Sequence, residues 1–70
     1  MNKSRLIQII QDTLIDFGIP RANKLSLSIA NQFNPSDSLK HMEKMMCVFV
    51  SKKDAIKIYK IIMDNKPYWE

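Results

Sequence analysis

The sequence predicts an all-α fold in which three or four short helices pack as a small compact bundle. Apolar side chains recur at helical spacing near both ends of the 70-residue chain, next to residues that typically begin and end helices. One glycine and three prolines divide the chain into four segments. Apolar residues make up 46% of the sequence, enough for the core of one domain spanning residues 1–70.

The first segment predicts a helix over about residues 5–17. Ser4 can cap its N-terminus. Gly18 suits a left-handed residue after the helix, Ile19 can then touch the last turn, and Pro20 prevents continuation. The predicted buried face consists of Leu6, Ile10, Leu14 and Phe17.

The second segment, about residues 21–33, fits two structures. Helical spacing relates Ala22, Leu25, Ile29 and Phe33. Apolar residues at 25, 27 and 29 also alternate with Ser26 and Ser28, as in a strand. We favour a helix because Ala30 and Gln32 extend the helical pattern, and residues 34–38 have the composition of a turn.

The third segment predicts a short helix over about residues 37–46 with an extended exit. Residues 47–50 form an apolar, β-leaning run, so an α+β fold with a hairpin from about 24–30 and 45–50 is the alternative. Cys47 lies in this run and is expected to be a small buried hydrophobe. Four methionines are expected to fill gaps in the core: Met42, Met45, Met46 and Met63.

The fourth segment predicts a helix over about residues 52–65. Ser51 is a good N-cap and Asp54 can complete a capping box. We expect Pro67 to end the helix and to leave a short tail, residues 66–70. The predicted buried face consists of Ala55, Ile58, Tyr59 and Ile62.

Residues 29–36 resemble the middle of a helix-turn-helix motif. Ala30 suits the inside of its first helix, and Ser36 suits the start of the second. The usual turn glycine is missing, and Lys40 stands where an inward apolar side chain is expected, one position after Leu39. A simple helical hairpin is the alternative. If the motif forms, the outward groups near DNA are Lys40, His41 and Lys44.

A row of lysines is the second candidate surface. Lys53, Lys57 and Lys60 follow helical spacing on the outward face of the fourth helix, with Lys52 nearby. A solvated lysine face is the alternative, and Asp64 continues the same row. The complete set of candidate nucleic-acid-binding residues is Lys40, Lys44, Lys52, Lys53, Lys57 and Lys60.

The terminal aromatic residues Tyr68 and Trp69 form a third candidate site. They can stack on a base or anchor a protein partner. The alternative, which we expect, is that the tail folds back and completes the core, because a free tryptophan suits a small soluble surface poorly.

Composition argues against enzymatic chemistry. A single glycine leaves no phosphate-cradling loop, and the seven acidic residues are scattered. Asp12 and Asp16 lie one turn apart and can bind a cation, although a solvated face is the simpler explanation. One cysteine and one histidine provide neither a disulfide nor a zinc site, so we expect no cofactor and no metal.

Charge and hydropathy suggest the compartment and the partner. The longest apolar run, residues 45–50, is too short to span a membrane, and no secretory leader is recognisable, so we expect a cytoplasmic protein. The net charge of +4 favours anionic partners. The leading hypothesis is a non-enzymatic regulator that binds nucleic acid through a basic helical face. The alternative is a protein-binding inhibitor or adaptor, such as small accessory proteins of mobile elements.

We predict that the chain is a homodimer. A core of this size typically supplies only about 3–5 kcal/mol, and the sequence offers no disulfide or zinc site to reinforce it. Static light scattering should give twice the mass of one chain. A heat-stable monomer at high protein concentration would refute the prediction.

Overall fold

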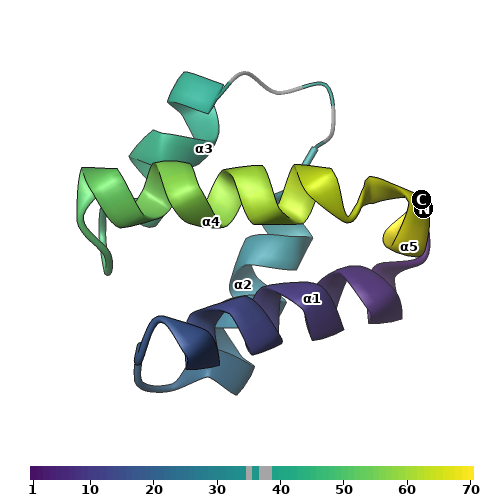
Figure 1. The fold of residues 1–70 in the computed structure, drawn as a ribbon, viewed down its shortest axis with the longest axis horizontal. Helices are drawn as coiled ribbons and strands as arrows, with labels where there is room; N and C mark the ends of the chain where they lie inside the picture. Colours follow the sequence, from purple (N-terminus) through teal and green to yellow (C-terminus); the bar gives the residue numbers. More distant parts are fainter. Residues whose placement is uncertain (35, 37–38) are drawn as a thin grey trace.

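The structure is a computed structural model, and it describes residues 1–34, 36 and 39–70. These residues form helices and turns, without a strand, so the all-α prediction is confirmed and the α+β alternative is wrong (Figure 1). The helices within the described part are α1 (Lys3–Asp16), α2 (Ala22–Gln32), α3 (Leu39–Met46), α4 (Lys52–Asp64) and α5 (Lys66–Trp69).

Helix α1 begins two residues earlier than predicted. Asn2, not Ser4, is its N-cap, and the Asn2 side-chain oxygen accepts a hydrogen bond from the Arg5 backbone N–H at 3.2 Å. Asparagine and serine cap helices about equally well. The backbone N–H of Asn2 also donates to the carbonyl of Trp69 at 2.6 Å, which fixes the start of the helix. Ser4 therefore lies in the first turn of α1.

The end of α1 matches the prediction. Gly18 has a left-handed φ of 70°, which glycine adopts without the steric cost of a Cβ. The N–H groups of Gly18 and Ile19 donate to the carbonyls of Ile15 and Leu14 at 2.9 and 3.0 Å. This pair of bonds is a Schellman motif, and it turns the chain sharply into α2.

Helix α2 resolves the ambiguity of the second segment. Its buried face contains Ala22, Ser26 and Ala30, which recur every four residues, together with Ile29. Ser26 fits this interior because its hydroxyl donates to the carbonyl of Asn23 at 2.9 Å. Small side chains allow two helices to approach closely, and α2 packs most extensively against α1.

The third segment differs from the prediction after its helix. Helix α3 is described from Leu39, and the predicted start at residues 37–38 lies outside the described residues. Residues 47–50 form a tight turn and bend instead of an extended exit. The N–H of Val50 donates back to the carbonyl of Met46 at 3.0 Å, so local backbone bonds outweigh the β-leaning composition.

Helix α4 begins as predicted, whereas the tail after it forms a helix that the sequence did not predict. The Ser51 hydroxyl accepts from the Asp54 N–H at 3.2 Å, half of the proposed capping box. Helix α4 ends at Asp64, one residue before the predicted end, and the tail then forms a separate short helix, α5, which includes Pro67. A proline is tolerated in the first turn of a helix because N–H groups there have no carbonyl partner within the helix.

The tail folds back, and Trp69 enters the core. Its side chain is only 1% exposed, and its indole N–H donates to the carbonyl of Ile62 at 2.8 Å. The ring meets Phe33 edge to face, with ring centroids 5.4 Å apart. Helix α5 therefore packs on both α1 and α4, and the two chain ends lie together (Figure 1).

The core joins two helical hairpins. Helix α1 packs on α2, α3 packs on α4, and α1 also packs on α4. Of the predicted core methionines, Met42 and Met46 are buried, and Met45 and Met63 are half-buried against the core. The buried apolar residues are Leu6, Ile10, Leu14, Ala22, Ile29, Ala30, Phe33, Met42, Met46, Ala55, Ile58, Ile62 and Trp69.

We predict that Trp69→Ala destabilises the protein by about 3–5 kcal/mol, because it opens a cavity among α1, α2 and α4. The neighbouring Tyr68→Ala is the control. Tyr68 is 46% exposed and its ring lies under the Arg5 guanidinium, so its loss should cost less than about 1 kcal/mol. Chemical denaturation measures both, and equal effects would contradict the assignment of Trp69 to the core.

Candidate functional site

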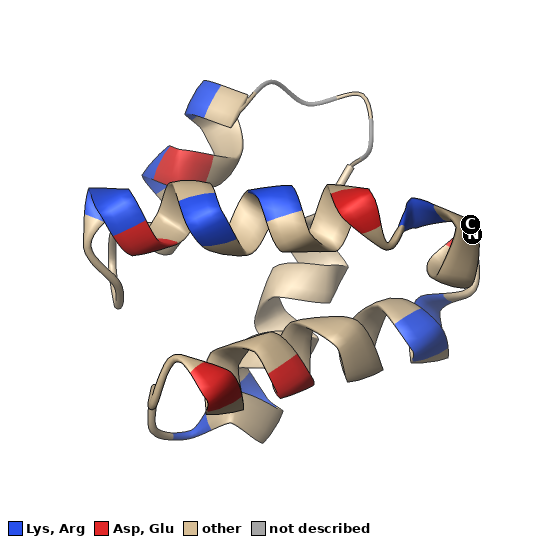
Figure 2. Cartoon of the chain, viewed as in Figure 1, with Lys and Arg blue, Asp and Glu red and all other residues tan. Residues whose placement is uncertain are grey.

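The predicted lysine row lies on the outer face of α4. Lys53, Lys57 and Lys60 are exposed, and Ala55, Ile58 and Ile62 are buried on the opposite side of the same helix. Figure 2 shows basic residues recurring along α4, with acidic residues near the two ends of the helix. Because the core fixes α4, the three lysines project from a rigid support.

Lys52 is separated from this row by an ion pair. Its ammonium lies 3.5 Å from a carboxylate oxygen of Glu43 on α3. Within the described part of the chain, no carboxylate pairs with Lys53, Lys57 or Lys60. Their charges are available to an external anion, whereas the charge of Lys52 is partly neutralised.

Lys40 and Lys44 form a second basic group, on α3. Both are exposed and lie one helical turn apart. They border a shallow hollow of about 460 Å³ together with His41, Glu43 and Cys47. The structure therefore distributes the six candidate lysines over two helices that pack together, α3 and α4.

The helix-turn-helix interpretation is not supported by the packing. In that motif two consecutive helices pack against each other across a short turn. Here α2 packs mainly on α1, and α3 packs on α4. The motif requires the side chain at position 40 to point into the core, but Lys40 is exposed. The residues of α3 that enter the core are Met42 and Met46. The alternative, a simple hairpin of α2 and α3, also fails, because the hairpins are α1–α2 and α3–α4.

The tail residues separate into one core residue and one surface residue. Trp69 is buried and is unavailable as a surface anchor while α5 is folded. Tyr68 remains exposed, and the Arg5 guanidinium lies 5.2 Å from its ring centroid. Arg5 also donates to the Tyr68 carbonyl at 3.3 Å, so the visible role of this pair is to fasten α5 to α1.

Three further residues with predicted roles lie at the surface: Cys47, Asp12 and Asp16. Cys47 was expected to be buried, and it is exposed, because it follows the last turn of α3 on the outer side of the turn to α4. Asp12 accepts a hydrogen bond from Gln8 at 2.9 Å, and Asp12 and Asp16 are both exposed. The described residues contain no group of three or more potential metal ligands.

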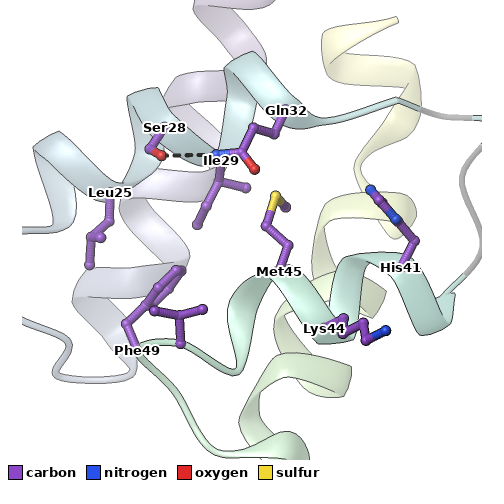
Figure 3. Close-up of a pocket in the computed structure, with 9 residues that line it drawn as sticks. Leu25, Ser28, Ile29, Gln32, His41, Lys44, Met45 and Phe49 are labelled. Atoms are coloured by element: carbon purple, nitrogen blue, oxygen red, sulfur yellow. Dashed lines mark hydrogen bonds between the residues drawn. The ribbon is translucent and has the colours of Figure 1, made fainter.

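An open cleft that the sequence did not predict lies between α2 and the α3–α4 corner, with a volume of about 550 Å³. Its apolar lining comes from Leu25, Ile29, Met45, Val48 and Phe49. Its polar lining comes from Ser28, Gln32, His41 and Lys44. Figure 3 shows the side chains of Leu25, Ile29, Met45 and Phe49 turned toward the space between the helices.

The cleft exists because α2 and α3 each have another main packing partner. Each helix leaves apolar side chains half-buried along the cleft, such as Leu25 on α2 and Met45 on α3. Val48, at the turn, is 85% exposed. The sequence contained one signal of this surface, the apolar run of residues 45–50, which we assigned to a possible strand.

No known protein family, curated protein or solved structure matches the chain. None of the described helices is long and apolar enough to cross a membrane. The functional argument therefore depends on the geometry and chemistry of this chain's own residues.

We predict that Cys47 reacts with a thiol reagent in the folded protein. Its exposure should allow complete modification without denaturant, because a reagent needs access to the sulfur. Ellman's reagent releases one coloured thiolate for each protein thiol that reacts, and its absorbance measures the extent of reaction. The denatured protein is the reference for full reaction. Modification only after denaturation would show that the thiol is buried in solution.

Proposed function

We propose that this chain is a non-enzymatic regulatory protein that binds nucleic acid through the basic face of α4. The observation that carries the proposal is the exposed row of Lys53, Lys57 and Lys60, which lacks intramolecular carboxylate partners within the described residues. Lys40 and Lys44 on the neighbouring α3 can extend the contact.

The spacing of the row suits a phosphate backbone. Lys53 and Lys60 are seven residues apart, which corresponds to about 10 Å along a helix. Successive phosphates on one DNA strand advance by about 3.4 Å along the duplex axis, so the row extends over about three nucleotides. Three lysines distributed over that length can each approach a phosphate oxygen.

The electrostatics of α4 favour an anion at one end of the row. The helix macrodipole adds partial positive charge at the N-terminal turn, where Lys52 and Lys53 lie. Asp64 is exposed beyond Lys60 and opposes a phosphate at the other end. Asp54 also lies in the N-terminal turn, so both ends of the row have an acidic neighbour, and the macrodipole is what favours stronger contacts at the N-terminal half.

The side chains of the row predict binding without sequence preference. Base edges in DNA are read by bidentate groups such as arginine, asparagine and glutamine. The row consists of lysines, whose ammonium groups bind phosphates as point charges. Binding would therefore be governed mainly by charge and by salt.

A protein-binding inhibitor or adaptor is the alternative. It is favoured by large apolar side chains at the surface, namely Val48, Ile15 and Leu27, which are 85%, 57% and 51% exposed. A stoichiometric protein complex that survives about 0.5 M salt would support this alternative, because exposed charge contacts are screened at that ionic strength.

We predict that the double substitution Lys53→Ala and Lys57→Ala weakens nucleic-acid binding and reduces its salt dependence. Each lost phosphate contact lowers the slope of log K against log salt concentration by about 0.9 for duplex DNA. The slope should therefore fall by almost two. Fluorescence anisotropy with a labelled duplex at several salt concentrations measures it.

The matched control is Lys3→Ala with Lys24→Ala. This variant loses the same charge from exposed positions on α1 and α2, away from the row. It should change the slope by much less than the α4 variant. Equal slopes for the two variants would indicate a general charge effect, and absence of binding by the unaltered protein would refute the proposed function.

A further inference from the structure

The cleft between α2 and the α3–α4 corner changes in polarity along its length. Leu25 on α2 and Phe49 after α3 lie near one end, and Gln32 and His41 lie at the other (Figure 3). This gradient arises because the two lining segments run in opposite directions. Residues 25–32 and residues 41–49 run antiparallel along the two sides of the cleft. The apolar Leu25 and Phe49 therefore share one end, and the polar Gln32 and His41 share the other.

The middle of the cleft is apolar. Ile29 is buried beneath it, and Met45 faces Ile29 from α3. A methionine side chain is flexible and adapts to the shape of an apolar ligand. An apolar chain lying between the two ends would therefore contact a continuous apolar surface.

The polar end carries positive charge. Lys44 lies at the rim, and none of the nine described residues that line the cleft is acidic. Lys40, one turn earlier on α3, borders the neighbouring hollow instead. Glu43, which is on the same helix, is paired with Lys52 and does not line the cleft. The charge at this end is complementary to an anionic group.

The size of the cleft fits a small ligand better than a folded partner. Its volume of about 550 Å³ lies within the range of about 300–1,000 Å³ found for small-molecule sites. A typical protein interface uses about 20–30 residues on each side. Nine of the described residues line the cleft, fewer than such an interface uses.

We propose that the cleft binds a free medium-chain carboxylate. The acyl chain lies along Ile29 and Met45 toward Phe49, and the carboxylate lies at the polar end beside Lys44. The α2 segment from Leu25 to Gln32 is about 10 Å long, a length that an extended chain of this class can follow. This inference is independent of the lysine row on α4.

The test is a titration of the ¹⁵N-labelled protein with decanoate below its micelle concentration, followed by NMR. We expect the amide signals of Leu25, Ile29, Met45 and Phe49 to shift, and the signal of Lys57 on the outer face of α4 to stay in place. Decyltrimethylammonium is the matched probe, because it keeps the chain and reverses the charge of the head group. It should bind more weakly.

Two exposed variants test the two ends of the cleft. Lys44→Glu should weaken decanoate binding about fivefold, as expected for loss of one exposed charge contact. Val48→Asp should also weaken it, because a charge enters the apolar end. Lys57→Glu is the control for net charge and should have little effect. Circular dichroism establishes that the variants are folded.

Several results would overturn the proposal. These are no amide shift up to about 10 mM decanoate, a concentration that fills about nine tenths of a site with a dissociation constant of about 1 mM, equal affinity for the two head groups, and equal losses in Lys44→Glu and Lys57→Glu. Binding to anionic lipid vesicles without binding to free decanoate would indicate a membrane surface and would also contradict the proposal.

Discussion

The burial of Trp69 is the interaction on which the rest of the structure depends. Its indole N–H bonds to the carbonyl of Ile62, its ring packs against Phe33, and its own carbonyl accepts from Asn2. These contacts join α5 to α4, α2 and the start of α1. Among the described residues Trp69 has the largest fully buried side chain, so this one residue contributes more apolar area to the core than any of its neighbours.

The helices were largely predictable, and the errors have local physical causes. Apolar spacing located α1 and α4 because it reports which face is buried. The cap of α1 was misassigned because Asn2 and Ser4 are equivalent by chemistry, and a contact with the tail distinguishes them. Pro67 was read as a terminator, although proline also suits a first helical turn. Cys47 was expected inside because it lies in an apolar run, but the turn there exposes it.

Surfaces were predictable only where one helix forms them. The lysine row follows from spacing along α4, so the sequence was sufficient to identify its members. Spacing could not show that Lys52 pairs with Glu43, because that contact joins two helices. The cleft was missed for the same reason. Leu25 and Phe49 are distant in sequence, and their shared surface exists only after the two hairpins pack.

The arrangement of the hairpins also separates the two proposed binding surfaces. The row lies on the outer face of α4, whose opposite face is held by the core, and the cleft lies between α2 and the α3–α4 corner. Because α2 packs mainly on α1 and α3 packs on α4, the cleft lies where the two hairpins face each other. Lys44 belongs to both surfaces, since it is one of the six candidate lysines and it also lines the cleft, so a bound carboxylate would offset one of the positive charges available to phosphate.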